Sequence, residues 1–167
     1  MAKLDLQYIA SLVDAAQAGD SNAFAELYLA TYQKQYDFSY QYLKDEHMAH
    51  DALQQTYVNA LKNLYSLPDS NIFIPWLYQI NFKVCFNKKE KTALNGDPEN
   101  RTAIIDGNVY SVKQLLNLPP SESRAIIMCY YHDMDVREIA KLMDCKPGAV
   151  KQYLKEGRRR LRELRQS

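Results

Sequence analysis

The sequence has few of the residues that interrupt regular backbone. Its 167 residues include only five glycines and six prolines, and these two residue types are the strongest local breaks in helices and strands. They fall in a few short segments and leave long uninterrupted stretches between them. We therefore expect long helices that are separated by a small number of turns.

Long apolar runs and paired cysteines are also missing. No apolar run approaches the roughly 18 residues that a membrane span needs, and the first residues lack the compact apolar block of a signal peptide. Cys85, Cys129 and Cys145 lie far apart and form no CxxC or CxxH pair. We therefore expect free thiols in a reducing compartment, no membrane insertion and a cytoplasmic location.

The motifs of common enzyme classes are absent as well. The sequence contains no Walker-type glycine loop, no nucleophile elbow and no dinucleotide-binding fingerprint. His47, His50 and His132 do not have metal-ligand spacing with the cysteines. We therefore predict that the protein is not an enzyme, that it has no catalytic or metal-binding residues, and that it uses no cofactor.

Charge is unevenly distributed, although the net charge of the chain is only +1. Residues 1–82 contain four basic and nine acidic residues, a net charge of −5, whereas residues 146–165 contain eight basic and two acidic residues, a net charge of +6. A cationic segment suits a polyanion such as DNA, and an acidic one does not. The two parts of the chain are therefore expected to bind different partners.

Apolar residues recur at the three- and four-residue steps of a helix along most of the chain. This periodicity is lost between Thr92 and Asn108, where turn signals cluster. We predict an all-α protein with two small helical domains, residues 1–91 and 109–167, joined by a flexible linker at residues 92–108. In the first domain, the apolar helix faces are Phe24, Leu27, Tyr28, Tyr32, Tyr36 and Tyr40, then Leu53, Tyr57, Val58, Leu61, Leu64 and Tyr65, then Trp76, Leu77, Ile80 and Val84.

Residues 134–167 have the pattern of a helix-turn-helix. Asp135 and Glu138 are spaced as a capping box at a helix start. Asp144 stands in the turn, where left-handed backbone is common and Asp is tolerated. Pro147 fits the first turn of the next helix, because the N–H that proline lacks is not needed there. Together these signals indicate two short helices with a tight turn between them.

The second helix of this motif is the candidate DNA-binding element. A helix fits the major groove, where its early residues reach base edges and its later cations contact phosphates. A basic helix can also be no more than a solvated surface, but the cap, the turn and the preceding helix favour DNA binding. The candidate DNA-binding residues are Lys146, Lys151, Gln152, Lys155, Arg158, Arg159 and Arg162.

Four motifs between Ala16 and Arg165 resemble the extracytoplasmic-function class of bacterial sigma factors. The opening of that class's region two is similar to GDSNAFAELYLATY, and its Glu-Asp-x-x-Gln-Glu-Thr-Phe signature is similar to HDALQQTYVNAL. Its Trp-Leu-x-x-Ile helix resembles PWLYQINFKVCFN, and its region four resembles LPPSESRAIIMCYYHDMDVREIAKLMDCKPGAVKQYLKEGRRRLREL. The order of the motifs, with a linker between the two sets, is more specific than either set alone.

The resemblance implies an alternative sigma factor that binds core RNA polymerase and directs promoter recognition, DNA melting and transcription initiation. The first domain would bind the polymerase clamp and the minus-ten element, and the second would bind the minus-thirty-five element. An anti-sigma factor that covers both domains is a possible further partner. The resemblance places polymerase binding at Asp51, Gln54 and Gln55, and minus-ten binding at Ser70, Asn71, Trp76, Lys83, Asn87 and Lys88.

Several residues depart from the family pattern, and two other functions stay open. Trp76 either stacks on an exposed base or anchors its helix in the core. A helix-turn-helix regulator would bind duplex DNA without polymerase, and a sigma-like decoy would bind polymerase without opening a promoter. The departures, which put the promoter sequence in doubt, are His50 and Gln55 in the signature, Gln79 and Lys83 after the tryptophan, and Pro147 and Ala149 at the start of the recognition helix.

Overall fold

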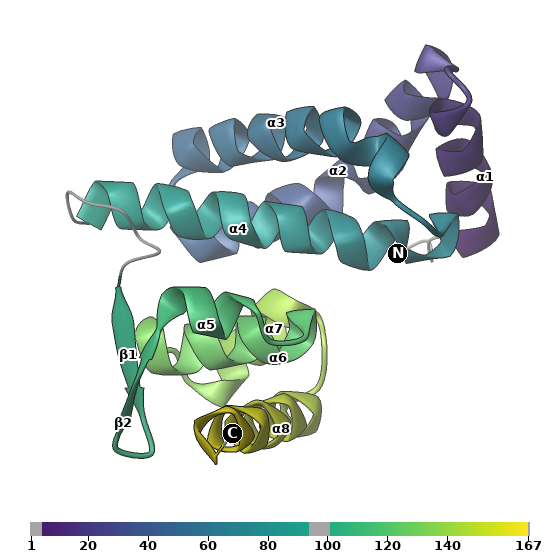
Figure 1. Ribbon diagram of the computed structural model, residues 1–167. Coiled ribbons are helices and arrows are strands. Elements are labelled where there is room, and N and C mark those ends of the chain that lie inside the picture. The colour runs from purple at the N-terminus through teal and green to yellow at the C-terminus, as the bar shows by residue number, and fades with distance from the viewer. Residues whose placement is uncertain (1–4, 94–100, 167) are drawn as a thin grey trace. The chain divides into compact units, whose positions relative to one another are not determined.

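Helices account for nearly all regular structure in residues 5–93 and 101–166, the part of the chain that the computed structural model describes (Figure 1). The prediction of an all-α fold is confirmed, with one short hairpin as an addition. The chain divides into two units, Met1–Lys89 and Glu90–Ser167. Much of the predicted linker, residues 94–100, lies outside the described residues.

The first unit is built from four helices that start at good capping residues. The side chains of Asp5, Asp20 and Asp45 accept hydrogen bonds from backbone N–H groups at the starts of the first three helices, which satisfies donors that a helix end leaves free. Asp69 caps a short turn before the fourth helix in the same way. The elements are α1 (Leu6–Gln17), α2 (Ser21–Leu43), α3 (Glu46–Asn63), η1 (Leu64–Ser66), η2 (Ser70–Ile72) and α4 (Phe73–Ala93).

A buried polar network ties α2, α3 and α4 together inside this unit. The Asn81 side chain accepts hydrogen bonds from Ser39 Oγ at 2.9 Å and from Thr56 Oγ1 at 3.2 Å. Its Nδ2 donates to both the backbone oxygen and Oε1 of Gln35, each at 3.0 Å. All four residues are buried. Because every partner is internal, the network fixes how the three helices align.

The second unit packs short helices against a long C-terminal helix. The core contains Ile126, Ile139, Val150 and Leu161, all fully buried. A Cβ atom at Gly157 would lie only 2.7 Å from Ile126 Cγ1, so the glycine permits a close approach of two helices. The helical elements are α5 (Val112–Leu116), α6 (Pro120–Ile126), the π-type turn η4 (Ile127–Tyr131), α7 (Val136–Met143) and α8 (Pro147–Gln166).

A two-stranded hairpin precedes these helices, where we predicted irregular chain up to residue 108 and helix from 109. Strands β1 (Thr102–Ile105) and β2 (Asn108–Ser111) pair antiparallel, with Ile105 opposite Asn108 (Figure 1). Asp106 and Gly107 between them have φ values of 52° and 77°, as in the two-residue turns that suit hairpins. The strands were missed because four residues are too few for alternation to be recognised.

Candidate nucleic-acid interface

The helix-turn-helix has the local geometry that its sequence predicts. Asp135 Oδ1 accepts a hydrogen bond from the Glu138 backbone N at 2.9 Å, and Glu138 Oε1 accepts one from the Asp135 backbone N at 3.5 Å. This reciprocal capping box starts α7. Asp144 ends it in left-handed backbone with φ 52° and ψ 50°, and α8 then begins at Pro147. The capping box, the turn and the helix start are therefore confirmed.

One side of α8 is buried and fixes which residues face outward. Val150, Leu154, Gly157 and Leu161 recur at helical steps and pack into the unit. Near the start of α8, the exposed residues include Lys146, Lys151, Gln152 and Lys155. These four are among the predicted DNA-binding residues. They make no side-chain hydrogen bond or ion pair within the described part of the chain, so their donors are available to a ligand.

Four cations form a line along one flank of α8, which we name the cationic row: Lys151, Lys155, Arg158 and Arg162. Their steps of four, three and four residues keep them on one side of a helix. The row is about 16 Å long, because each residue advances a helix by about 1.5 Å. A cationic line of this length is suited to a phosphate backbone.

The C-terminal half of the cationic row also contacts the rest of the unit. Arg158 Nη1 donates to the Tyr130 hydroxyl at 3.1 Å. Arg162 Nη1 lies 3.7 Å from Asp106 Oδ2 in the hairpin turn. Further along, the Arg165 guanidinium carbon is 5.7 Å from the centre of the Tyr110 ring. The last turns of α8 are therefore attached to the hairpin, whereas its first turns are not.

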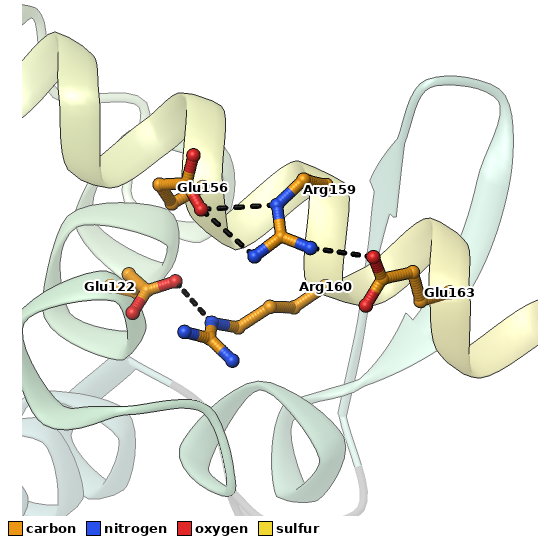
Figure 2. A network of polar contacts seen from close by, with 5 residues as sticks. All are labelled: Glu122, Glu156, Arg159, Arg160 and Glu163. Atoms are coloured by element: carbon orange, nitrogen blue, oxygen red, sulfur yellow. Dashed lines mark hydrogen bonds and ion pairs between the residues drawn. The ribbon is translucent and has the colours of Figure 1, made fainter.

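Next to the cationic row, α8 has a cluster of ion pairs, which is drawn in Figure 2. Arg159 Nε and Nη2 contact Glu156 Oε2 at 3.0 and 2.9 Å, and Arg159 Nη1 contacts Glu163 Oε1 at 2.5 Å. The hydrogen bond that Arg159 donates to Glu156, followed by the charges of Glu156 and Glu163, raises the pKa of the Arg159 guanidinium. Arg160 Nε contacts Glu122 Oε1 of α6 at 2.7 Å. Arg159, a predicted DNA ligand, is thus placed between two carboxylates.

A shallow hollow of about 390 Å³ lies beside the turn between α7 and α8. Its lining includes Arg137 and Lys141 of α7, Asp144 and Pro147. The two cations are exposed and one helical turn apart, close to the start of α8. Sequence reasoning did not select them as DNA-binding residues, although their spacing on the first helix of the motif was a usable signal.

The predicted polymerase-binding residues lie on the exposed side of α3. Asp51, Gln54 and Gln55 are all exposed. Asp51 Oδ2 lies 3.7 Å from His47 Nε2, one turn earlier, and Gln55 Nε2 donates to Asn59 Oδ1 at 2.9 Å. The three side chains thus occupy one accessible surface of this helix.

The same surface of α3 also contains apolar residues that we had assigned to an apolar helix face. Val58 is 46% exposed, Leu61 is 51% exposed and Tyr65, just beyond α3, is 70% exposed. The buried side of α3 instead uses several alanines, which let a neighbouring helix approach closely. Leu53, Tyr57 and Leu64 are buried as predicted, so counting only large apolar residues merged two different sides of the helix into one face. The buried residues of α3 are Ala49, Ala52, Leu53, Thr56, Tyr57 and Ala60.

The tyrosines of α2 were also predicted to lie on an apolar helix face, and this prediction is only partly right. Tyr28, Tyr32 and Tyr40 are 37%, 38% and 47% exposed, so they line the edge of the buried face. They stack along the helix surface instead, with ring centres 5.5 Å apart for Tyr28 and Tyr32 and 6.1 Å apart for Tyr36 and Tyr40. A phenol ring tolerates this position because one end is apolar and the other is polar.

The predicted minus-ten residues lie in η2 and on α4. Lys83 and Asn87 are exposed and one turn apart, and Trp76 lies two turns before Lys83 on the same side of the helix. Trp76 is half-buried against the apolar core, with its ring centre 5.9 Å from that of Phe73. The packing of Trp76 agrees with an anchoring role and leaves part of its ring accessible.

The remaining minus-ten candidates differ in how accessible they are. Ser70 and Lys88 are half-buried, whereas Asn71 is exposed. Asn71 Nδ2 donates to Asp69 Oδ1 at 3.0 Å, and the Asn71 backbone N donates to the same oxygen at 2.9 Å. The Asn71 amide is therefore oriented by Asp69, with its oxygen left to accept a hydrogen bond.

Comparison with known proteins relates both units to one family. Residues 112–161 match the family model for sigma-70, region 4. The chain is 24% identical over 168 residues to the ECF RNA polymerase sigma factor SigW of Bacillus subtilis (strain 168), covering 87% of this chain and 90% of SigW. It is 25% identical over 152 residues to SigM of the same organism, covering 83% and 93%. The match to sigma-70 region 4 and the similarity to these relatives along most of the chain support an extracytoplasmic-function class sigma factor.

The fold of this chain is also found in a solved structure. CnrH, in a structure described as its complex with the cytosolic domain of CnrY, superposes with a TM-score of 0.50 and 17% sequence identity over 94% of this chain and 96% of the CnrH chain. Within residues 5–93 and 101–166, the chain has no helix long and apolar enough to cross a membrane. The same residues contain no group of three or more His, Cys, Asp or Glu that could hold a metal ion.

Proposed function

We propose that this protein is an alternative sigma factor that binds core RNA polymerase and directs promoter recognition, DNA melting and transcription initiation. The observation that carries the proposal is the combination of a region-four helix-turn-helix with an acidic helical unit in one chain that spans 90% of SigW. The duplex-binding regulator leaves the exposed polar and apolar surface of α3 without a role. The relatives of this chain are transcription initiation factors, not enzymes. The protein is proposed to act in the cytoplasm with polymerase.

The second domain, residues 109–167, is proposed to read the minus-thirty-five element through α8. Lys151 and Gln152 lie in its second turn, where recognition helices contact base edges. Lys155 continues along the cationic row toward the phosphates. Arg137 and Lys141 of α7 add positive charge beside the start of α8. The proposed contacts are Lys146, Lys151, Gln152, Lys155, Arg158 and Arg162, and Arg159 is treated separately below.

The first domain, residues 1–91, is proposed to bind the polymerase clamp through α3. Asp51, Gln54 and Gln55 supply polar groups, and Val58 and Leu61 supply apolar area on the same surface. An apolar centre with polar groups around it is the usual composition of a protein interface. An anti-sigma factor that blocks the clamp would have to cover this surface.

The minus-ten element is proposed to bind across η2 and α4. A base that loses its pairing partner during melting can be held by stacking and by hydrogen bonds to its edges. Ser70, Asn71 and the accessible part of Trp76 are the proposed base contacts. Lys83, Asn87 and Lys88 would then follow the backbone of the opened strand. The linker between the domains, predicted at residues 92–108, is proposed to end before β1 (Thr102–Ile105), which belongs to the second unit.

Run-off transcription with core polymerase from the same organism, over a genomic promoter library, tests the proposal. We expect specific transcripts only when the protein is added. A stable complex with polymerase but no specific transcript would favour the sigma-like decoy. No complex at all would favour the polymerase-independent regulator.

Two single substitutions then test the assignment of α8. Lys151→Ala and Gln152→Ala should each weaken or relax minus-thirty-five recognition by about 1–3 kcal/mol for a lost base contact. Lys113→Ala on α5 removes the same charge elsewhere in this unit and should leave base preference unchanged. Equal effects of all three substitutions on every sequence would show that α8 is not the reading helix.

A further inference from the structure

Two groups of charged residues lie next to each other on α8, the cationic row and the cluster of Glu156, Arg159 and Glu163. We propose that Glu156 and Glu163 set the DNA specificity of α8 by holding Arg159 away from the phosphates of the duplex. The inference rests on the proposed function, in which α8 reads the minus-thirty-five element. It assigns to these two carboxylates a role in discrimination between promoter and other DNA.

The first support is the geometry of the Arg159 side chain (Figure 2). A guanidinium has five N–H donors, and here Nε, Nη1 and Nη2 each direct one of them to Glu156 or Glu163. The carboxylates lie three residues before and four residues after Arg159, on the same helix. The cluster therefore forms within α8 and needs no other element to hold it.

The second support is the place of Arg159 on the helix. Arg159 lies four residues after Lys155 and three residues before Arg162, so it is next to the cationic row on α8. Without its carboxylate partners, Arg159 would extend the positive charge that the row offers to a phosphate backbone. Glu156, Arg159 and Glu163 together have a net charge of −1, and the following arginine, Arg160, is paired with Glu122 of α6. The Glu156–Arg159–Glu163 cluster therefore adds no attraction for phosphate to that of the cationic row.

The third support is accessibility. The side chains of Arg159 and Glu163 are 43% and 62% exposed, so solvent and DNA can reach the cluster. Ion pairs this exposed are weak, and a phosphate could replace a single carboxylate. Two carboxylates on one guanidinium make that replacement harder, because both contacts have to be given up for one phosphate. Arg159 is therefore restrained without being buried.

The consequence follows from what phosphate contacts contribute. They raise the affinity for every duplex and contain no sequence information. An Arg159 free to reach a phosphate would strengthen binding to unrelated DNA as much as to a promoter. By withholding that contact, Glu156 and Glu163 leave a larger share of the binding free energy to base contacts near Lys151 and Gln152.

The test compares the full-length protein with the double variant Glu156→Gln/Glu163→Gln on a labelled duplex that lacks promoter sequence. Binding is measured by anisotropy over a range of salt concentrations. We expect the slope of log affinity against log salt to steepen by about 0.9, the value for one added phosphate contact, and affinity near 0.15 M salt to rise about fivefold. Holoenzyme made with the double variant should discriminate less between promoter and unrelated DNA.

Three further variants make the result specific. Adding Arg159→Gln to the double variant should return the slope to that of the unsubstituted protein, because the new phosphate contact is lost. Lys155→Gln in the cationic row should make the slope shallower by about 0.9. Asp14→Asn on α1 removes one negative charge from the other unit and should leave the slope unchanged.

Two outcomes would overturn the inference. If the double variant keeps the original slope and the triple variant loses about 0.9, Arg159 already contacts phosphate in the unsubstituted protein. If discrimination by holoenzyme is unchanged in the double variant, the carboxylates do not set specificity. Failure of the proposed function would be seen separately, as absence of promoter-specific transcripts with the unsubstituted protein, while the salt slopes on unrelated duplex are still measured.

Discussion

The two units place polar groups in opposite ways. The first unit buries Gln35, Ser39, Thr56 and Asn81 in its interior and exposes apolar side chains on α3. The second unit has an apolar core around Ile126 and Ile139 and has most of its ion pairs on α8, with the buried Glu90, which contacts Arg101 and Tyr131, as an exception. A buried polar network specifies how helices align, whereas exposed charges mainly specify what the unit attracts. The difference matches the partners proposed for each, a protein surface for α3 and a polyanion for α8.

The largest expected effect comes from breaking the buried network of the first unit. Asn81→Leu would leave the buried Gln35 Oε1 without its donor, whereas Ser39 Oγ and Thr56 Oγ1 keep their hydrogen bonds to the backbone oxygens of Gln35 and Ala52. A buried polar group without a partner costs about 1–3 kcal/mol, and we expect destabilisation at the upper end of this range. Urea unfolding followed by fluorescence of Trp76, the single tryptophan, measures this. Asn63→Leu at an exposed site should change stability by less than about 0.5 kcal/mol. Equal effects would mean that the network does not stabilise this unit.

The second effect concerns the apolar contact that holds α8 in the second unit. Gly157→Ala would place a Cβ atom 2.7 Å from Ile126 Cγ1, and overpacking of this kind costs about 1–3 kcal/mol. Gly148→Ala, in the first turn of the same helix, meets no atom within 4 Å and should be neutral or stabilising by up to about 1 kcal/mol. Hydrogen exchange of the backbone amides in α6 and α8 distinguishes the two variants, because only Gly157→Ala should speed it. Faster exchange in both variants would contradict the close approach at Gly157.

The third effect tests whether the exposed apolar residues of α3 belong to an interface. Leu61→Ala should reduce affinity for core polymerase about tenfold, because loss of a side chain inside an interface costs on the order of 1–2 kcal/mol. Stability should not change, since Leu61 is 51% exposed. Leu29→Ala on α2, where the leucine is 68% exposed, is the matched control and should bind normally. If both variants bind normally, the interface does not extend to Leu61.

The smallest effect at neutral pH concerns the thiol beside the buried network. Burial raises the pKa of Cys85 from 9.0 to about 12, so the folded protein holds the neutral thiol. Its stabilising contribution is complete below pH 9 and is lost as the pH rises through about 12. We expect Cys85→Ala to lessen the fall in unfolding free energy between pH 9 and 11. An identical pH dependence in both proteins would argue against this assignment.

Features set by local sequence could be predicted, and those set by packing could not. The Asp135 cap, the left-handed Asp144 and the start of α8 at Pro147 depend on neighbouring residues, and all were predicted from them. The exposure of Leu61 depends instead on which side of α3 the alanines allow a neighbour to approach. No count of large apolar residues contains that information.

The charged face of α8 could be predicted in composition but not in arrangement. The sequence indicates a basic helix, and residues such as Lys151 and Lys155 are exposed as expected. It does not indicate that Arg159 contacts two carboxylates at once, because the choice of a side chain among several neighbours on its own helix depends on rotamers. Arg159 and Arg162 therefore looked equivalent in the sequence and differ in the structure.

The hairpin has a consequence for the far end of α8. Helix ends fray, and a terminal helix with no neighbour loses order in its last turns first. Here Asp106 lies beside Arg162 and Tyr110 lies under Arg165. The hairpin therefore holds the last turns of α8 against the rest of the unit. The N-terminal turns of α8, which are proposed to contact bases, therefore belong to a helix whose other end is held in place.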